Sequence, residues 1–182
     1  MTSSRPSVFL LVDGYNVIGA WASLKQTYLM SGLEDARRTL VEVLVNYSSY
    51  QHFDTRIVFD AYAQNKPGEH EHITQNLSIQ FTDAGQTADS YIEKTCAVFH
   101  KHNLRRTKRL IVATSDRAQQ RVVTGYGAEW ISALQLEADV RLARTNVLQK
   151  KSSYKRKNGN HLANTLDKQV QDKLTRLRFG ME

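Results

Sequence analysis

Acidic side chains follow three apolar stretches of the sequence, each where a buried strand is expected to end. The stretches VFLLV, RIVF and LIVATS run directly into Asp13, Asp60 and Asp116. Because the carboxyl ends of parallel strands lie along one edge of a sheet, where ligands bind, these carboxylates are expected to gather at a single edge. A fourth acid, Asp89, opens the helix expected after the stretch LSIQFT and is predicted at the same edge.

Gathered carboxylates repel one another, and without a counterion the pKa of at least one of them would rise. A divalent cation would relieve that repulsion. Mg²⁺ and Mn²⁺ prefer oxygen ligands and keep several waters, which leaves positions for a phosphate and an attacking water. Asn16 is expected to hydrogen-bond a carboxylate, a bound water or a substrate backbone, and Gly14 to let the chain turn close to the ligand.

A purely structural role explains some of the same acids. Aspartate at a strand end often caps the next helix or forms a turn, and Asp-Gly is a common turn pair. Taken alone, Asp60 fits that role better than a functional one, and Asp116 fits both equally. The expectation of a functional site depends on several acids converging.

The elements that must position these acids are strands alternating with helices. Apolar runs predict strands, and apolar residues at helical spacing predict helices. Thr87 is expected to cap one helix, and Ser132 with Gln135 forms a capping box at the start of another. The predicted strands cover residues 8–12, 55–59, 77–82 and 110–113, and the predicted helices cover 33–47, 88–99, 117–123 and 132–147. This alternation favours an α/β domain with a mainly parallel sheet.

The composition of the 182 residues suits one globular domain of ordinary core size. No apolar run approaches the roughly 18 residues that cross a bilayer, and residues 1–7 lack the apolar core of a signal peptide. Cys96 is the single cysteine and is expected to be a small buried hydrophobe. These features predict a cytoplasmic protein that does not contact a membrane.

The net charge of +7 comes from the C-terminal segment. Residues 141–182 hold 11 Lys and Arg against 3 Asp and Glu, whereas residues 1–140 hold 14 against 15. A localised basic stretch attracts phosphate backbones, which favours nucleic acid as a partner over a solubilising role. Residues 150–161 (KKSSYKRKNGNH) are interpreted as a mobile linker or loop, and residues 162–179 as a basic amphipathic helix. The predicted division is therefore a domain at 1–149 and a basic extension at 150–182.

Five motifs in order, LLVDGYNVIGAW, VFDAY, QTADSYIEK, VATSDRAQQRVV and GYGAEWIS, resemble the YacP-like branch of the NYN-domain proteins, which belong to the PIN-like nucleases. The resemblance spans roughly residues 8–147. It implies a PIN-like three-layer α/β/α domain, metal-dependent endoribonuclease activity, and cleavage of mRNA in a ribosome-associated context. Gln86 departs from the family pattern, in which an acid is expected just before Thr-Ala-Asp. This departure predicts weaker metal binding.

The family's acidic positions map onto Asp13, Asp60, Asp89 and Asp116, with Asn16 in the DGYN signature. In the resulting hypothesis Asp13, Asp89 and Asp116 hold one or two Mg²⁺ or Mn²⁺ ions, and Asp60 and Asn16 position water or the outer shell. Ser115 and Arg117 are weaker candidates for phosphate contact. The expected products are a 5′-phosphate and a 3′-hydroxyl.

RNA capture is assigned to two basic clusters, for which a solvated surface is the competing interpretation. The residues are Arg105, Arg106, Lys108, Arg109, Lys150, Lys151, Lys155, Arg156 and Lys157. Three alternatives stay open: a non-catalytic RNA- or ribosome-binding module of the same fold, a receiver-type or phosphatase-like protein, and a toxin-like nuclease. Tyr15 counts against a phosphatase, which would carry a second acid at that position. The oligomeric state is not predicted.

Overall fold

The computed structural model describes residues 7–61, 68–102 and 108–165, and from residue 150 onward it describes the backbone only. The described strands are β1 (Ser7–Asp13), β2 (Asp54–Phe59), β3 (His70–Thr74), β4 (Leu77–Phe81), β5 (Lys108–Ala113) and β6 (Glu129–Ile131). The described helices are α1 (Gly14–Ala20), α2 (Ala22–Ser31), α3 (Leu33–Gln51), α4 (Ala88–Lys101), α5 (Arg117–Gly125) and α6 (Ala133–Thr165).

The strands form one mixed sheet in the order β3-β4-β2-β1-β5-β6. All neighbours pair in parallel except β3, which runs antiparallel to β4 at the edge. The central strand β1 pairs with β2 on one side, where Val12 lies opposite Ile57, and with β5 on the other, where Val12 lies opposite Ala113. This arrangement confirms the predicted α/β class and its mainly parallel sheet.

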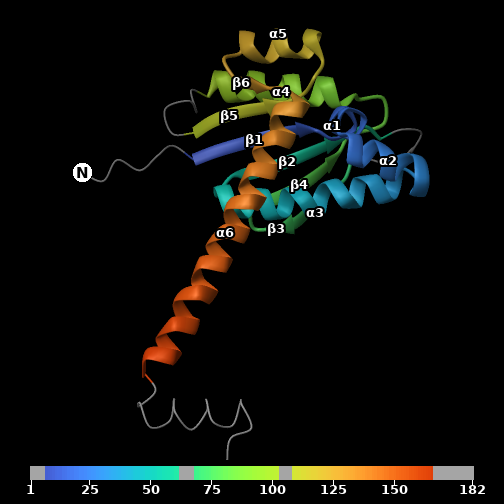
Figure 1. Ribbon diagram of the computed structural model, residues 1–182. Coiled ribbons are helices and arrows are strands. Elements are labelled where there is room, and N and C mark those ends of the chain that lie inside the picture. The colour runs from blue at the N-terminus through green and yellow to red at the C-terminus, as the bar shows by residue number, and fades with distance from the viewer. Residues whose placement is uncertain (1–6, 62–67, 103–107, 166–182) are drawn as a thin grey trace, which may run out of the picture. The chain divides into compact units, whose positions relative to one another are not determined.

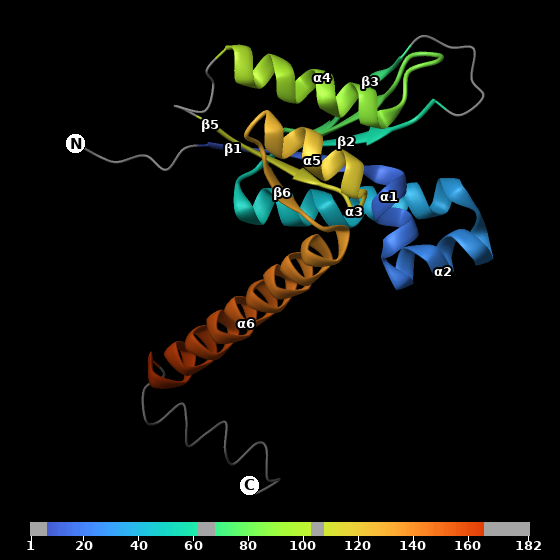
Figure 2. The ribbon, with the colours of Figure 1, turned by 90° about the horizontal axis from the view of Figure 1, so that it is seen from above.

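Helices cover both faces of the sheet and give three layers, with α4 and α5 on one face and α3 on the other (Figures 1 and 2). Side chains of a strand alternate between faces, so odd and even positions of β1 enter different cores. Leu11 belongs to the core beneath α4 and α5, where it packs with Ile92, Cys96 and Val123. Cys96 is thus the buried hydrophobe that its sequence context predicts, and its burial raises the pKa of its thiol to about 12.

The structure corrects the expected role of Gly14. Gly14 is the first residue of α1 and does not form a turn. A Cβ atom there would overlap Cε1 and Cδ1 of the buried Phe59 ring. The residue is therefore glycine because β2 packs directly against the start of α1, not because the backbone needs an unusual conformation.

Two further segments differ from the sequence-based expectation. The helices α1 and α2 were not predicted, since α2 buries only Leu24 and shows no apolar stripe. Gly32, with a φ of 89°, separates α2 from α3. The antiparallel edge strand β3, which holds His70 and His72, was not predicted either, because most of it is exposed and it has no alternating apolar pattern.

The chain divides into two units, residues 1–141 and 142–182, and each is described by itself. Residues 150–161 are helical as part of α6, so their interpretation as a linker or loop was wrong. That interpretation relied on their low apolar content, whereas Lys and Arg are good helix formers without any apolar face. The predicted helix at 162–179 lies outside the described residues beyond 165. None of the described helices is long and apolar enough to cross a membrane.

Candidate active site

The carboxyl edge of the sheet carries all four predicted acids, each on a different connection. Asp13 is the last residue of β1, and Asp60 follows β2 directly. Asp89 lies in the first turn of α4, after β4, and Asp116 caps α5, after β5. Asp13 and Leu11 are two residues apart in β1, so their side chains lie on the same face of the sheet, the one covered by α4 and α5. All four acids therefore lie at the edge of the sheet where the sequence analysis placed them.

Asp13 is the buried member of the group, with only 7% of its surface exposed. The pKa of its carboxyl is raised from 3.8 to about 6, mainly by burial, with smaller contributions from the negative charges of Asp89, Asp60 and Asp116. A hydrogen bond from the backbone N–H of Asn16, at 3.1 Å, opposes this rise. The four carboxylates are therefore close enough to interact electrostatically.

The other three acids also accept hydrogen bonds from helix termini or from a neighbouring side chain. Asp116 accepts from the backbone N–H groups of Ala118, at 2.6 Å, and Gln119, at 3.2 Å. Asp60 accepts from the backbone N–H of Ala88 and so joins the end of β2 to the start of α4. The capping role left open for Asp116 is confirmed, since it is the N-cap of α5. Asp60 instead makes a long-range hydrogen bond to α4, whose N-cap is Thr87, and in both acids Oδ1 is the acceptor.

Gln119 is a residue of this site that the sequence analysis missed. Its side chain is buried in α5 and donates from Nε2 to Oδ1 of Asp89. Burial and the charges of Asp116 and Asp60 raise the pKa of Asp89, and the hydrogen bond from Gln119 lowers it. The available signal was spacing, because Gln119 precedes the buried Val123 by one helical turn.

Asn16 joins two of the connections that carry acids. Its side-chain Oδ1 accepts a 2.7 Å hydrogen bond from the backbone N–H of Ser115, which follows β5. The chain leaves β1 toward β2 and leaves β5 toward β6, in opposite directions, so this bond spans the point where parallel α/β sheets bind ligands. The hydroxyl of Ser115, expected near phosphate, instead accepts from the backbone N–H of Ala133 at the start of α6.

The charge of the four acids has no cationic partner within the described part of the chain. The described ion pairs join Arg37 to Glu34, Arg38 to Asp35 and Arg109 to Glu129. In that same part, no three His, Cys, Asp or Glu side chains are close enough together to hold a metal ion. The metal-ligand role of Asp13, Asp89 and Asp116 therefore stays a prediction.

The residues proposed to capture RNA lie apart from this edge or outside the description. Lys108 and Arg109 begin β5 and so lie at the opposite, amino edge of the sheet. Arg109 forms a two-point contact with Glu129, at 2.7 and 2.6 Å, which offsets its charge. Arg105 and Arg106 lie outside the described residues. The five basic residues after position 149 lie in α6, where the structure describes only the backbone.

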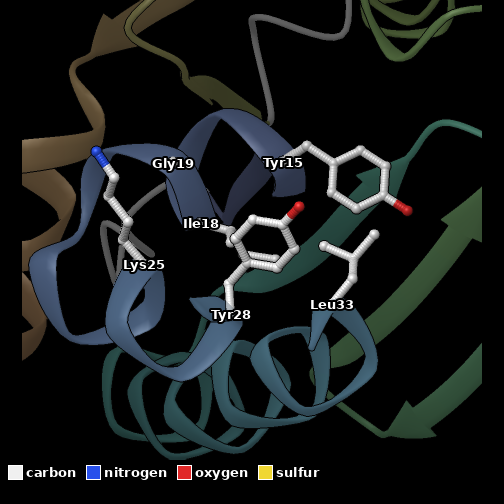
Figure 3. A pocket seen from close by; sticks show the side chains of 6 residues that line it. All are labelled: Tyr15, Ile18, Gly19, Lys25, Tyr28 and Leu33. Atoms are coloured by element: carbon white, nitrogen blue, oxygen red, sulfur yellow. The ribbon is translucent and has the colours of Figure 1, made fainter. Parts of the chain in front are cut away.

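A pocket opens beside α1, the helix that Asp13 caps. It has a volume of about 490 Å³ and is lined by Tyr15, Ile18, Gly19, Lys25, Tyr28 and Leu33 (Figure 3). Tyr28 is 47% exposed, and Tyr15 is half-buried. The lining comes from α1, α2 and the first residue of α3. This pocket was not predicted, because none of these residues stands out by spacing or charge.

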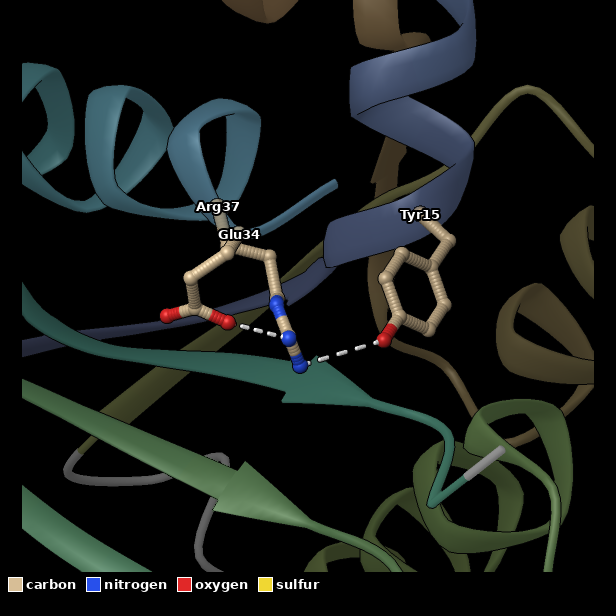
Figure 4. A network of polar contacts seen from close by, with 3 residues as sticks. All are labelled: Tyr15, Glu34 and Arg37. Atoms are coloured by element: carbon tan, nitrogen blue, oxygen red, sulfur yellow. Dashed lines mark hydrogen bonds and ion pairs between the residues drawn. The ribbon is translucent and has the colours of Figure 1, made fainter. Parts of the chain in front are cut away.

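Arg37 of α3 contacts Tyr15, one of the residues that line this pocket. Its Nη1 lies 3.5 Å from the hydroxyl of Tyr15, and its Nη2 contacts Glu34 (Figure 4). The guanidinium carbon lies 6.0 Å from the ring centre of Phe59. The ring of Tyr15 lies 5.1 Å from that of Phe59, which immediately precedes Asp60. Tyr15 is therefore fixed between the pocket and the acidic edge.

The mainly parallel sheet, the helices on both faces and the acids at its carboxyl edge define a three-layer α/β domain. The model of the YacP-like NYN domain matches residues 10–179, and the chain belongs to this family, whose domain is of the nuclease type. The match runs well beyond the motifs at 8–147 and includes most of the basic extension. The sequence is similar to that of the uncharacterized protein YacP of Bacillus subtilis (strain 168), with 37% identity over 131 residues, 72% of this chain and 74% of that protein.

Solved structures support the same relationship. The crystal structure of Rae1 (YacP) from Bacillus subtilis is 31% identical, with a TM-score of 0.64, and the match covers 94% of this chain and 95% of that one. A crystal structure of a mutant of the same Bacillus subtilis protein is similar at the same identity, with a TM-score of 0.68 over 81% of this chain and 82% of that one.

Proposed function

We propose that this protein is a metal-dependent endoribonuclease that cleaves phosphodiester bonds of RNA, in particular mRNA in a ribosome-associated context. The observation that carries the proposal is the group of four electrostatically coupled carboxylates, from four connections, at the carboxyl edge of a nuclease-type domain. No described cationic side chain pairs with them. At neutral pH the negative charges of these carboxylates repel one another, and a bound cation would offset that repulsion.

The chemistry of the donors fits Mg²⁺ or Mn²⁺. All four side chains offer carboxylate oxygens, and each uses Oδ1 for its hydrogen bond to the protein. Asp13, Asp89 and Asp116 would hold the ion, and Asp60 and Asn16 would act from the outer shell. Because no three acids converge closely enough in the described structure, binding requires the carboxylates to turn toward one another. Asp89 has the most freedom to turn, since it is exposed and its partner is a side chain.

A divalent ion in such a site lowers the pKa of a bound water and stabilises negative charge on the leaving oxygen. In the proposed reaction the water oxygen bonds to phosphorus, the bond from phosphorus to O3′ breaks, and the O3′ atom takes up a proton. The products are a 5′-phosphate and a 3′-hydroxyl. The chain's own contribution is to fix the acids at the starts of helices and to hold the connections after β1 and β5 together through Asn16.

The direct test is cleavage of single-stranded RNA in Mg²⁺ by the full chain and by the variant Asp13→Asn with Asp89→Asn. We expect the rate to fall at least about a hundredfold, because both substitutions keep shape and remove charge from the reacting centre. Glu93→Gln is the matched control, since Glu93 is an exposed acid on the same helix, one turn after Asp89. An unchanged rate in the double variant would remove the proposed activity.

A second candidate is a non-catalytic RNA- or ribosome-binding module of the same fold. It is favoured by the hydrogen bonds of Asp13, Asp60 and Asp116, which give these acids a structural role without any metal. The two candidates differ in one measurement. RNA binding without Mg²⁺-dependent cleavage by the unmodified chain, at any enzyme concentration that saturates the RNA, would establish the module.

A further inference from the structure

The pocket formed by α1, α2 and Leu33 (Figure 3) is not used by the proposed chemistry, although it begins next to it. Tyr15 lies two residues after Asp13, in the first turn of the helix that Asp13 caps. Its ring packs on Phe59, and its hydroxyl is within electrostatic reach of Asp60. An RNA chain whose phosphate reaches the acids would therefore bring a neighbouring nucleotide to this pocket.

The lining has the chemistry of a site for a planar aromatic ligand. Tyr15 and Tyr28 offer two rings, and Ile18 and Leu33 add aliphatic surface between and below them. Tyr28 is 47% exposed, which leaves its ring available for contact. The volume of about 490 Å³ falls within the range of small-ligand pockets. Bases of single-stranded RNA stack on aromatic rings of this kind without a strict sequence requirement.

The charge of the pocket also matches one strand of RNA. Lys25 lines it and pairs with no described carboxylate, so its ammonium is available to a phosphate. Glu34, the acid next to Leu33, is paired with Arg37 and does not oppose an anion. The acidic edge repels phosphates in the absence of a metal, and Lys25 supplies attraction beside it.

We propose that this pocket binds one unpaired base of the RNA, next to the nucleotide whose phosphate meets the acids, with Tyr28 stacking on the base and Lys25 contacting a phosphate. The identity of the substrate at this site rests on the proposed function. The site adds a contact that single-stranded RNA can make and paired RNA cannot. Tyr15 lines the pocket on the side that faces the acidic edge.

The test measures binding separately from cleavage. The full chain carrying Asp13→Asn and Asp89→Asn is titrated, in EDTA, into short single-stranded RNAs that each carry one 2-aminopurine, whose fluorescence falls on stacking. Introducing Tyr28→Leu, which keeps apolar volume but removes the ring, is expected to weaken binding about 5- to 100-fold and to restore the fluorescence. Tyr28→Phe is expected to bind normally. Leu29→Ala is the matched control, since Leu29 is the next residue of α2, is 74% exposed and does not line the pocket.

The outcomes separate the two proposals. Equal affinity and equal quenching with Tyr28→Leu and Leu29→Ala would overturn the base pocket, including the case in which the pocket receives a partner protein instead. Loss of binding with Tyr28→Leu supports the pocket even where the unmodified chain fails to cut RNA in Mg²⁺, a failure that would overturn only the proposed activity. In the cleaving enzyme, Tyr28→Leu should raise KM and leave kcat nearly unchanged.

Discussion

The two sides of the sheet's carboxyl edge are built from opposite kinds of side chain. Toward α4 and α5 lie the acids Asp13, Asp60, Asp89 and Asp116. Toward α1, α2 and α3 lie the tyrosine pocket and Arg37. The acidic side accumulates charge without a described cation, whereas the other side pairs its acid, Glu34, with its own arginine. The two sides therefore differ in sign: the described acidic side carries unpaired carboxylates, and the pocket side carries the unpaired ammonium of Lys25.

A single helix turn separates these two sides. Asp13, Gly14 and Tyr15 are consecutive, and Asp13 belongs to the acidic side while Tyr15 belongs to the pocket. Between Asp13 and Tyr15 the chain passes from β1 into α1, which changes the direction of the side chains. Phe59 ends β2 and Asp60 follows it, and strand alternation sends these neighbouring side chains to opposite faces. Substitutions in these segments can therefore disturb one side alone or both together.

The largest effect is expected for Gly14→Ala, which disturbs both sides. The new methyl group would overlap three atoms of the Phe59 ring, which is fully buried and cannot move aside without repacking β2. We expect a loss of about 3 kcal/mol or more in the free energy of unfolding, at the upper end of overpacking effects. Urea unfolding of the full chain measures this loss.

Gly19→Ala is the control for that substitution, because it lies in the same helix and its added methyl group meets nothing within 4 Å. Alanine favours helix over glycine by about 1 kcal/mol, so this variant should be equally or more stable than the unmodified chain. Similar losses for both glycines would show that α1 itself, rather than its contact with Phe59, sets the sensitivity.

The next largest effect is expected for Asp13→Asn, which changes the acidic side only. This substitution should raise the free energy of unfolding by an amount that depends on pH. The pKa of Asp13 is raised in the folded chain to about 6, from 3.8. The folded state therefore holds this proton more tightly, and stability falls as the pH rises between these two values and stays lowered above 6. Asparagine also caps helices and carries no charge. The free energy of unfolding of the variant should exceed that of the unmodified chain by more at pH 7.5 than at pH 4.5. In the absence of divalent ions, this difference should grow by about 2 kcal/mol between the two pH values.

Urea unfolding at the two pH values checks this expectation, with Asp54→Asn, an exposed acid at the amino end of β2, as the control. Added Mg²⁺ at pH 7.5 should stabilise the unmodified chain and not the Asp13→Asn variant, because a ligand that binds only the folded state raises its stability. A difference between variant and parent that does not change with pH would contradict the buried, charge-coupled state of Asp13.

The smallest effect is expected for Gln119→Leu, which tests whether Gln119 sets the pKa of Asp89 on the acidic side. Leucine removes the hydrogen bond that lowers the pKa of Asp89, so that pKa should rise and the acid limb of the pH–activity profile should move to higher pH. Stability should change by about 1 kcal/mol or less, since leucine also removes the buried Oε1 atom of Gln119, which lacks a partner in the described structure.

Carboxyl-carbon NMR of Asp89 during a pH titration measures the shift directly. Gln120→Leu, the neighbouring position on α5, should leave the titration of Asp89 unchanged. A titration that is the same in both variants would show that Gln119 does not set the protonation of Asp89.

Much of the fold could be predicted from periodicity. The strands around Leu11, Ile57 and Val112 are buried on both faces, and their continuous apolar runs are the signal. The strand around Ile79 was predicted from its alternation of apolar and polar residues. The caps at Thr87 and Ser132 could also be recognised, and both accept the expected backbone hydrogen bonds. The described elements that escaped prediction were α1, α2, β3 and β6. The segments α2 and β3 are mostly exposed and carry no apolar pattern, and α1 and β6 are short, at 7 and 3 residues.

The acids of the candidate site could be predicted, and the residues that surround them could not. Asp13, Asp60 and Asp116 stand out because a charge ends an apolar run. Gln119 and Arg37 show no such contrast, since a glutamine or arginine within a helix is ordinary. Their partners, Asp89 and Tyr15, are 30 and 22 residues away along the chain.

By itself the sequence determined the class of fold and the four acids, because apolar runs, caps and the charges that interrupt them are local features. Only the tertiary structure decided which side chains share a face of the sheet edge. It made Asp13 and Asp116 helix caps, joined Asp60 to the start of α4, placed Gln119 on Asp89 and formed the pocket beside Tyr15. The reason is physical: hydrogen bonds and cavities depend on distances between elements far apart in the chain, which no local pattern records.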